Sequence, residues 1–125
     1  MEFYQLNQSK GKKVSQFNSN FIISRIAQTK KEAQISCMYL EPNGVIGYHQ
    51  ATVPQLLLVV SGEGYVRNEI EHYVKVEAGM SVYWSKDEWH ETKTDTGLMA
   101  IVIECEDLMP ALMPFPKNCG EPIGE

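Results

Sequence analysis

The sequence has few basic residues and no long apolar run, and both absences narrow the class of protein. It contains 11 Lys and Arg against 16 Asp and Glu, which gives a net charge of −5. Nucleic-acid binders gather Lys and Arg against the phosphates, so we exclude nucleic acid as a partner. No stretch approaches the length of a membrane span, and residues 1–13 contain no apolar core of signal-peptide length. We therefore expect no membrane partner.

Cysteine is also scarce, and its spacing excludes two classes of small protein. Cys37, Cys105 and Cys119 are odd in number, lie far apart and form no CxxC pair. A disulfide framework needs paired cysteines, and zinc clusters use closely spaced ones. We expect reduced thiols and a cytoplasmic location.

Helical periodicity is absent over any three turns, whereas β-branched runs with a period of two dominate the chain. Turn-forming residues separate these runs, and short strands at such spacing indicate an all-β sandwich or barrel. Gly62-Glu63-Gly64 is interpreted as a hairpin turn after a strand. The predicted strands cover residues 21–28, 33–41, 55–62, 65–69, 72–79, 81–85, 90–94 and 98–104.

The length of 125 residues fits one domain with a substantial core. We expect an irregular N-terminal lead over residues 1–15, a β domain over 16–112 and a Pro- and Gly-rich tail over 113–125. Only residues 106–112 suggest a turn of helix, which the following prolines would end.

Two stretches resemble the two sequence motifs of the cupins. Residues 42–64, PNGVIGYHQATVPQLLLVVSGEG, resemble the first motif, which contains a Pro-Gly turn, His-x-His, Glu and Gly. Residues 79–94, GMSVYWSKDEWHETKT, resemble the second, which runs Gly, Pro-x-Gly, His and Asn. The resemblance implies a single-domain, cupin-type jelly-roll β-barrel, the double-stranded β-helix.

The spacing of these two stretches matches the cupin motifs better than their residue identities do. His49 and His90 stand at two of the four metal-ligand positions of the family. Ala51 replaces the second histidine of the first motif, and Gln55 replaces its glutamate. The resemblance thus implies a metal site that retains two of its four usual ligands.

Strand geometry predicts which side chains share the barrel interior. Alternate residues of a strand point to one face, so His49, Ala51 and Gln55 should point the same way unless a bulge intervenes. His90, Thr92 and Thr94 should likewise share a face. We predict a metal site at His49, Gln55 and His90, in which the two imidazoles suit Zn, Ni or Fe and the Gln55 amide is a weaker ligand.

A small-molecule ligand pocket is expected around this site. Trp84 shares its face with Val82 and is expected to cap the mouth of the barrel above His90. The predicted pocket residues are Met38, Leu40, Ala51, Leu57, Trp84, Thr92 and Thr94.

Two functions of different classes stay open. One is a metal-dependent small-molecule enzyme, which the two retained histidines favour. Its reaction is unassigned, because the family that the sequence resembles includes isomerases, dioxygenases, lyases and sensor domains. The other is a non-catalytic, metal-free binding module, which Ala51 and Gln55 favour. A homodimer is also expected, because residues 35–40 are apolar on both faces of their strand and one face needs a cover. The N-terminal lead could instead fold over that face.

Overall fold

The computed structural model describes residues 1–114, and nearly all of its regular structure is strand. Apolar residues at every second position drive this, since alternate side chains of a strand face the same side. The only helical segments in the described part are two 3₁₀ turns, η1 (Gln8–Lys10) and η2 (Gln16–Asn18). The strands are β1 (Glu2–Gln5), β2 (Lys12–Val14), β3 (Phe21–Ile23), β4 (Ala27–Gln28), β5 (Gln34–Leu40), β6 (Val45–Gln50), β7 (Gln55–Asn68), β8 (Val74–Glu77), β9 (Met80–Trp84), β10 (Trp89–Lys93), β11 (Leu98–Glu104), β12 (Met109–Pro110) and β13 (Met113–Pro114).

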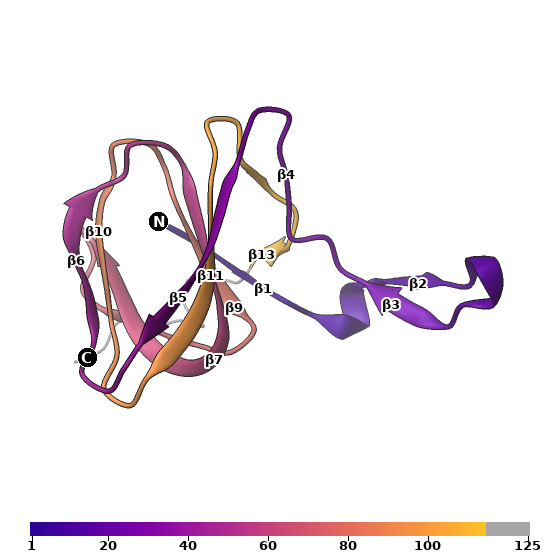
Figure 1. The fold of residues 1–125 in the computed structure, drawn as a ribbon, viewed down its shortest axis with the longest axis horizontal. Coiled ribbons are helices and arrows are strands. Elements are labelled where there is room, and N and C mark those ends of the chain that lie inside the picture. The colour runs from indigo at the N-terminus through magenta and orange to yellow at the C-terminus, as the bar shows by residue number, and fades with distance from the viewer. Residues whose placement is uncertain (115–125) are drawn as a thin grey trace.

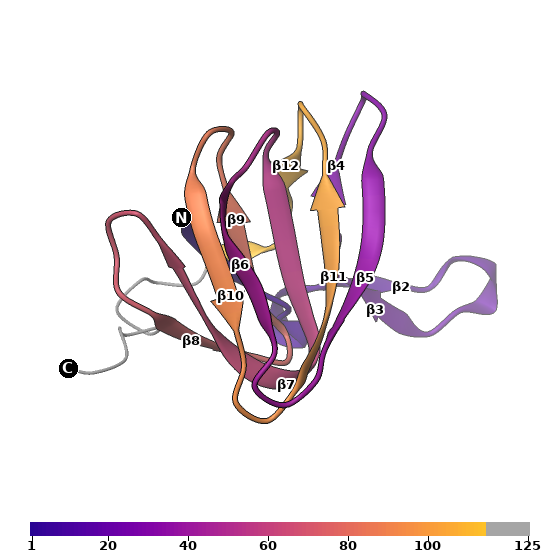
Figure 2. The same cartoon turned by 60° about the vertical axis from the view of Figure 1, so that its left-hand side comes forward.

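Two layers of antiparallel strands enclose the core, and strand β7 belongs to both layers (Figures 1 and 2). The first layer runs in the order β5, β11, β7, β9, β1, β13. The second runs β6, β10, β7, β8. This arrangement is the jelly roll that the sequence predicts, so the all-β prediction is confirmed.

Strand β7 is continuous over 14 residues where the sequence suggests two strands and a hairpin. Residues 55–62 pair with β9 and β11, and residues 63–66 pair with β8, so the chain bends between layers without reversing. Gly62 has φ +78°, and a Cβ there would lie 2.2 Å from the carbonyl oxygen of Gly97. The interpretation of residues 62–64 as a hairpin is therefore wrong, because the glycines permit a sharp bend inside one strand.

The core fills the space between the layers and is made mostly of aliphatic side chains, together with Phe3, Met80 and Trp84. Trp84 is 1% exposed and is among the largest fully buried side chains. A second, smaller cluster forms on the outer face of the first layer, where Leu56, Cys105 and Leu108 are buried. The segments around β4 and β12 thus cover one part of that outer face.

Three expectations about the chain ends differ from the structure. Residues 2–5 of the supposed irregular lead form β1, which pairs with β9 and buries Phe3 in the core. Residues 106–112 contain strand β12 instead of a helical turn. Met113 and Pro114, the first residues of the expected tail, form β13 against β1, while residues 115–125 lie outside the described part. Otherwise the predicted domain boundaries stay a prediction.

The predicted strand over residues 21–28 is two strands with different partners. β3 pairs with β2 in a two-stranded hairpin, and β4 pairs with β12. The β2–β3 hairpin, residues 12–23, projects from the barrel as an arm (Figure 1).

Candidate functional site

A cavity of about 180 Å³ opens between the two layers at one end of the barrel. Its walls come from strands of both layers and from the loop after β6. It is lined by Met38, Ile46, His49, Gln50, Thr52, Gln55, Leu57, Trp84, His90, Thr92, Val102 and Glu104. Seven of the predicted site and pocket residues are in this lining: Met38, His49, Gln55, Leu57, Trp84, His90 and Thr92.

His49 and His90 face each other across neighbouring strands. Their Cα atoms are partners in the β6–β10 ladder, and their ring centroids lie 4.4 Å apart. The register shifts between His90 and Thr92, which places an extra residue in β6. A bulge of this kind redirects side chains, and so His49 and Ile46 both line the cavity although they are three residues apart.

Backbone carbonyls hold both imidazole rings in the same way. His49 Nδ1 lies 2.7 Å from the carbonyl oxygen of Gly47, and His90 Nδ1 lies 3.2 Å from that of Glu88. A carbonyl oxygen only accepts hydrogen bonds, so each Nδ1 carries the proton in the neutral ring. The Nε2 atom of each ring then keeps its lone pair.

Trp84 holds the His90 ring in place from the other side. The two rings are stacked with centroids 4.3 Å apart and an interplanar angle of 24°. Burial lowers the pKa of His90, and the nearby His49 lowers it further, against the opposing effect of the Glu88 carbonyl. His90 is therefore held in its neutral form near pH 7, which is the form that binds metals.

Two oxygen-bearing side chains approach the histidines from the first layer. Gln55 begins β7, and its Cα is the partner of both Trp84 in β9 and Glu104 in β11. The Gln55 amide nitrogen lies 3.5 Å from a carboxylate oxygen of Glu104. The cavity thus contains a carboxylate beside the amide that stands in the glutamate position of the first cupin motif.

The sequence-based interpretation misses Glu104. The signal was available, because Leu98, Ala100 and Val102 alternate toward the core and Glu104 continues that face of β11. Gln50 and Thr52 are also missed. They line the mouth at the end of β6 and in the following loop, where strand parity gives no guidance.

His49 and Gln55 both line the cavity, but not because residues 49–55 alternate along one strand. The prediction assumes one strand through His49, Ala51 and Gln55, whereas β6 ends at Gln50 and β7 begins at Gln55. Ala51 is fully buried in the connecting loop, where its backbone N–H donates to Glu88 and its carbonyl accepts from Asp87. It lies outside the cavity lining because these bonds tie the loop to the turn before β10.

Leu40 and Thr94, two other predicted pocket residues, lie at the opposite end of the barrel. Leu40 packs against the main core and pairs with Leu98. The Thr94 hydroxyl donates to the Glu63 carbonyl at 2.6 Å and accepts from the Gly97 N–H at 2.9 Å. Thr94 therefore closes a turn. It does not line the cavity, because it follows β10 at the end of the barrel away from His90.

Glu88 braces the segment that leads into His90. Its carboxylate accepts hydrogen bonds from the Asn68 amide and the Ser85 N–H, and it pairs with the Met1 ammonium at 2.7 Å. Burial raises the pKa of Glu88, but these hydrogen bonds outweigh it and bring the pKa below its usual value. Glu91, on the other face of β10, pairs with Arg67 and Tyr73.

The fit of the cavity to a metal ion is partial. Two neutral imidazoles are good ligands for Zn²⁺, Ni²⁺ or Fe²⁺. Within residues 1–114, however, no group of three or more His, Cys, Asp or Glu side chains is positioned to hold a metal. Such an ion would have two strong protein ligands and the weaker Gln55 amide.

The profile of the cupin domain family matches residues 36–104. This span includes most of β5, all of β6 to β11 and every residue that lines the cavity. The chain belongs to the cupin family.

Solved structures agree with this assignment at the level of the fold. A cupin-like protein from Thermotoga maritima is 18% identical, with 74% of this chain and 75% of that chain covered and a TM-score of 0.58. An RmlC-like cupin from Shewanella frigidimarina is 20% identical, with 60% and 67% covered and a TM-score of 0.56. The DMSP lyase DddQ from Ruegeria pomeroyi is 18% identical, with 87% and 59% covered and a TM-score of 0.56.

Comparison with curated protein sequences gives no match to this cupin. Within the described residues, none of the helices has the length and apolar character needed to cross a membrane.

Proposed function

We propose that this cupin binds a divalent transition metal through His49 and His90 and holds a small molecule beside it. The observation that carries the proposal is the matched support of the two rings. Each Nδ1 donates to a backbone carbonyl, so two Nε2 lone pairs are available in one cavity. Metal-binding histidines characteristically have such a second hydrogen bond, because it fixes the tautomer and the orientation of the ring.

The burial of His90 supports the same proposal. A histidine that binds metal must be neutral, and burial keeps the pKa of His90 below its ordinary value. Gln55 would offer its amide oxygen as a third ligand, and Glu104 would place a negative charge nearby. When bound, the metal would act as a Lewis acid toward a small molecule in the cavity.

The size of the cavity limits the ligand. Pockets for drug-sized molecules occupy about 300–1,000 Å³, whereas this cavity has about 180 Å³. The buried Trp84 indole N–H has no hydrogen-bond partner within the described residues, so a polar ligand or water at this wall would satisfy it. We propose a small polar molecule, such as a sugar or a carboxylate, as the ligand.

A His49→Ala, His90→Ala double variant tests the metal site, and His72→Ala is the matched control. His72 is exposed and lies outside the cavity. Untagged proteins are purified gently, analysed for metals and titrated with Zn²⁺. We expect the wild type and His72→Ala to bind one equivalent, and the double variant to lose at least about 100-fold in affinity. Equal metal binding by all three proteins would refute the site.

A metal-free binding module is the second candidate. It is favoured by the absence, within residues 1–114, of a third His, Cys, Asp or Glu ligand beside the two histidines. In this case small sugars or carboxylates should raise the melting temperature of the protein in excess chelator by mass action. A screen of such ligands that finds no shift would count against this candidate.

The proposal also places the protein in a reducing compartment such as the cytoplasm. Cys37 is exposed and Cys105 is buried, and both are free thiols. An exposed thiol persists best where glutathione keeps it reduced. Cell fractionation with an antibody against the protein would test this location.

A further inference from the structure

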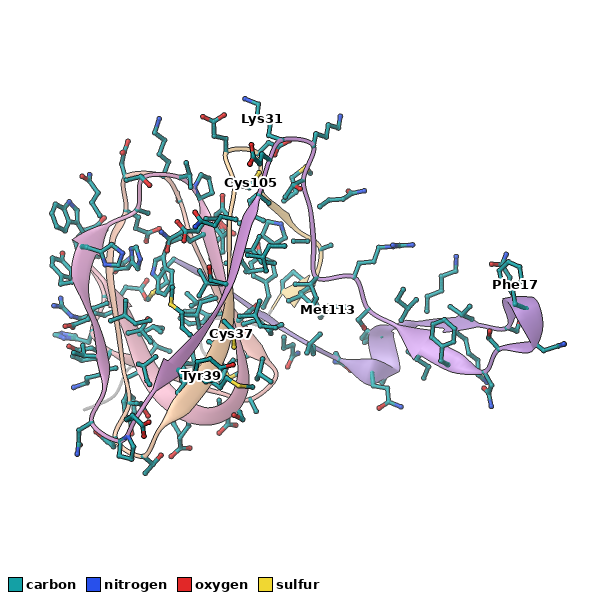
Figure 3. All side chains as sticks on the ribbon, in the orientation of Figure 1. Phe17, Lys31, Cys37, Tyr39, Cys105 and Met113 are labelled. Atoms are coloured by element: carbon teal, nitrogen blue, oxygen red, sulfur yellow. The ribbon has the colours of Figure 1, made fainter. Side chains whose placement is uncertain are left out.

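The β2–β3 arm extends from the barrel with apolar side chains that no other part of residues 1–114 covers. Within these residues its strands pair only with each other, and Phe21 and Ile22 are 49% and 41% exposed. Phe17 lies at the tip and is 96% exposed (Figure 3). An isolated two-stranded hairpin is marginally stable in water, so this arm needs a surface to pack against.

The backbone at the tip of the arm supports the same conclusion. Phe17 has φ 59° and ψ 35°, which is the left-handed conformation that bulky residues rarely adopt. Strain of this kind persists where the surroundings compensate for it. The Phe17 side chain is almost fully exposed in a single copy, so contacts with another surface would have to compensate for the strain.

A second bare apolar surface lies on strand β5. Ile35 and Tyr39 are 66% and 75% exposed, and Cys37 lies exposed between them. These three residues, here called the β5 patch, share the outer face of the first layer. Within the described part of the chain, β5 pairs only with β11, so it is the edge strand of that layer. Exposed apolar edge strands promote association with another chain.

The described residues cover the neighbouring part of this outer face but leave the β5 patch bare. The segments around β4 and β12 cover Leu56, and Leu108 of the second segment packs against it. Figure 3 shows Phe17 at the far end of the arm, well away from Cys37 and Tyr39 of the same copy. The arm and the patch therefore complement each other without meeting in one molecule.

The distribution of charge favours contact between the arm of one copy and the body of another. The arm, residues 12–23, contains two basic and no acidic residues, whereas the rest of the chain contains nine basic and sixteen acidic residues. The arm is thus +2 and the remainder is −7. Glu32 and Glu41 flank β5 and are exposed, as are Lys12 and Lys13 in the arm. Opposite charges at the rim of an interface steer association.

We propose that the β2–β3 arm of one copy packs over the β5 patch of a second copy, and that the exchange is reciprocal. Each copy has one arm and one patch, so a two-fold dimer satisfies both and closes the assembly. Phe17 and Phe21 cover Tyr39 and Ile35 of the other copy. The lysines of the arm lie near the acidic residues at the two ends of β5.

Light scattering on three single variants tests this dimer. Phe17→Asp alters the arm and Tyr39→Asp alters the patch. Ile70→Asp is the control, because Ile70 is 83% exposed and lies in the turn between β7 and β8. We expect the wild type and Ile70→Asp to be dimers at tens of micromolar. The arm and patch variants should dissociate at least about 100-fold more readily.

Several results would overturn the proposal. A monomeric wild type would do so, and so would Phe17→Asp that stays dimeric while Tyr39→Asp dissociates, since the patches would then meet without the arms. Circular dichroism checks that each variant is folded. The milder Phe17→Ser and Tyr39→Ser replace any variant that fails this check.

Mixing the two variants sharpens the test. A mixed dimer of Phe17→Asp and Tyr39→Asp retains one intact arm against one intact patch, whereas neither variant alone retains any. We expect mixing to restore a weak dimer population. Mixing that restores no dimer would refute reciprocal exchange.

Discussion

The two ends of the barrel interior share the same strands but differ in chemistry. At the cavity end, β7, β10 and β11 present Gln55, His90 and Glu104. At the other end, β11 buries Leu98, and Thr94 closes the turn after β10. The closed end therefore maintains the fold, while polar side chains that could bind a ligand gather at the cavity end. Substitutions should therefore separate stability from binding according to the end that they alter.

The largest effect is expected from Gly62→Ala at the closed end. The new Cβ would lie 2.2 Å from the Gly97 carbonyl oxygen, in a backbone with φ +78°. Strain and overlap together should lower the free energy of unfolding by about 3–5 kcal/mol in a urea titration. Gly47→Ala is the control, because a Cβ there meets nothing within 4 Å. Similar losses in both variants would contradict the role of the Gly62 bend.

Thr94→Val should destabilise the closed end without affecting the cavity. The substitution removes a hydroxyl that bonds Glu63 and Gly97 and leaves both backbone groups unpaired. We expect a loss of about 1–3 kcal/mol in unfolding free energy. The affinity for Zn²⁺ should be unchanged, and a large loss of affinity would show that the two ends are not independent.

Glu88→Gln tests the brace behind His90 through the pH dependence of stability. The folded-state pKa of Glu88 is lowered, so its contribution is present above the unfolded pKa of about 4.3 and is lost as pH falls through the lower folded pKa. The wild type should exceed the variant by about 1–2 kcal/mol at pH 7, and the gap should narrow below about pH 4. Chemical unfolding in chelator at several pH values measures this.

The exposed Glu77 provides the control for that experiment. Glu77→Gln removes the same charge from an exposed position and serves as the comparison variant. A constant difference between the wild type and Glu88→Gln down to pH 3 would contradict the lowered pKa of Glu88.

The smallest effect is expected from Glu104→Gln at the cavity end. The carboxylate is only partly buried, so solvent screens its attraction for a cation. We expect Zn²⁺ affinity to fall by about 3–10-fold with little change in stability. Glu106→Gln alters an exposed carboxylate two residues away that pairs with Lys31. Equal Zn²⁺ affinities for the two variants would remove Glu104 from the proposed site.

The sequence by itself determined several of the strands and the two histidines that line the cavity. Alternation of apolar residues is a local property, and so the strands over residues 81–85, 90–94 and 98–104 agree closely with β9, β10 and β11. The motif spacing also identified His49 and His90, which the fold brings side by side. The cupin assignment is confirmed by the family match over residues 36–104.

Only the tertiary structure decided how the remaining residues are grouped. The bulge in β6, the loop at Ala51 and the continuity of β7 depend on which strands pair, and pairing involves residues distant in the sequence. Glu104 lies beside Gln55 because their strands pair in that register. Thr94 lies beyond the cavity, where its hydroxyl donates to the Glu63 carbonyl. The sequence thus determines which face a side chain takes along an unbroken strand, whereas long-range strand pairing decides the bulges and the height of each side chain in the barrel.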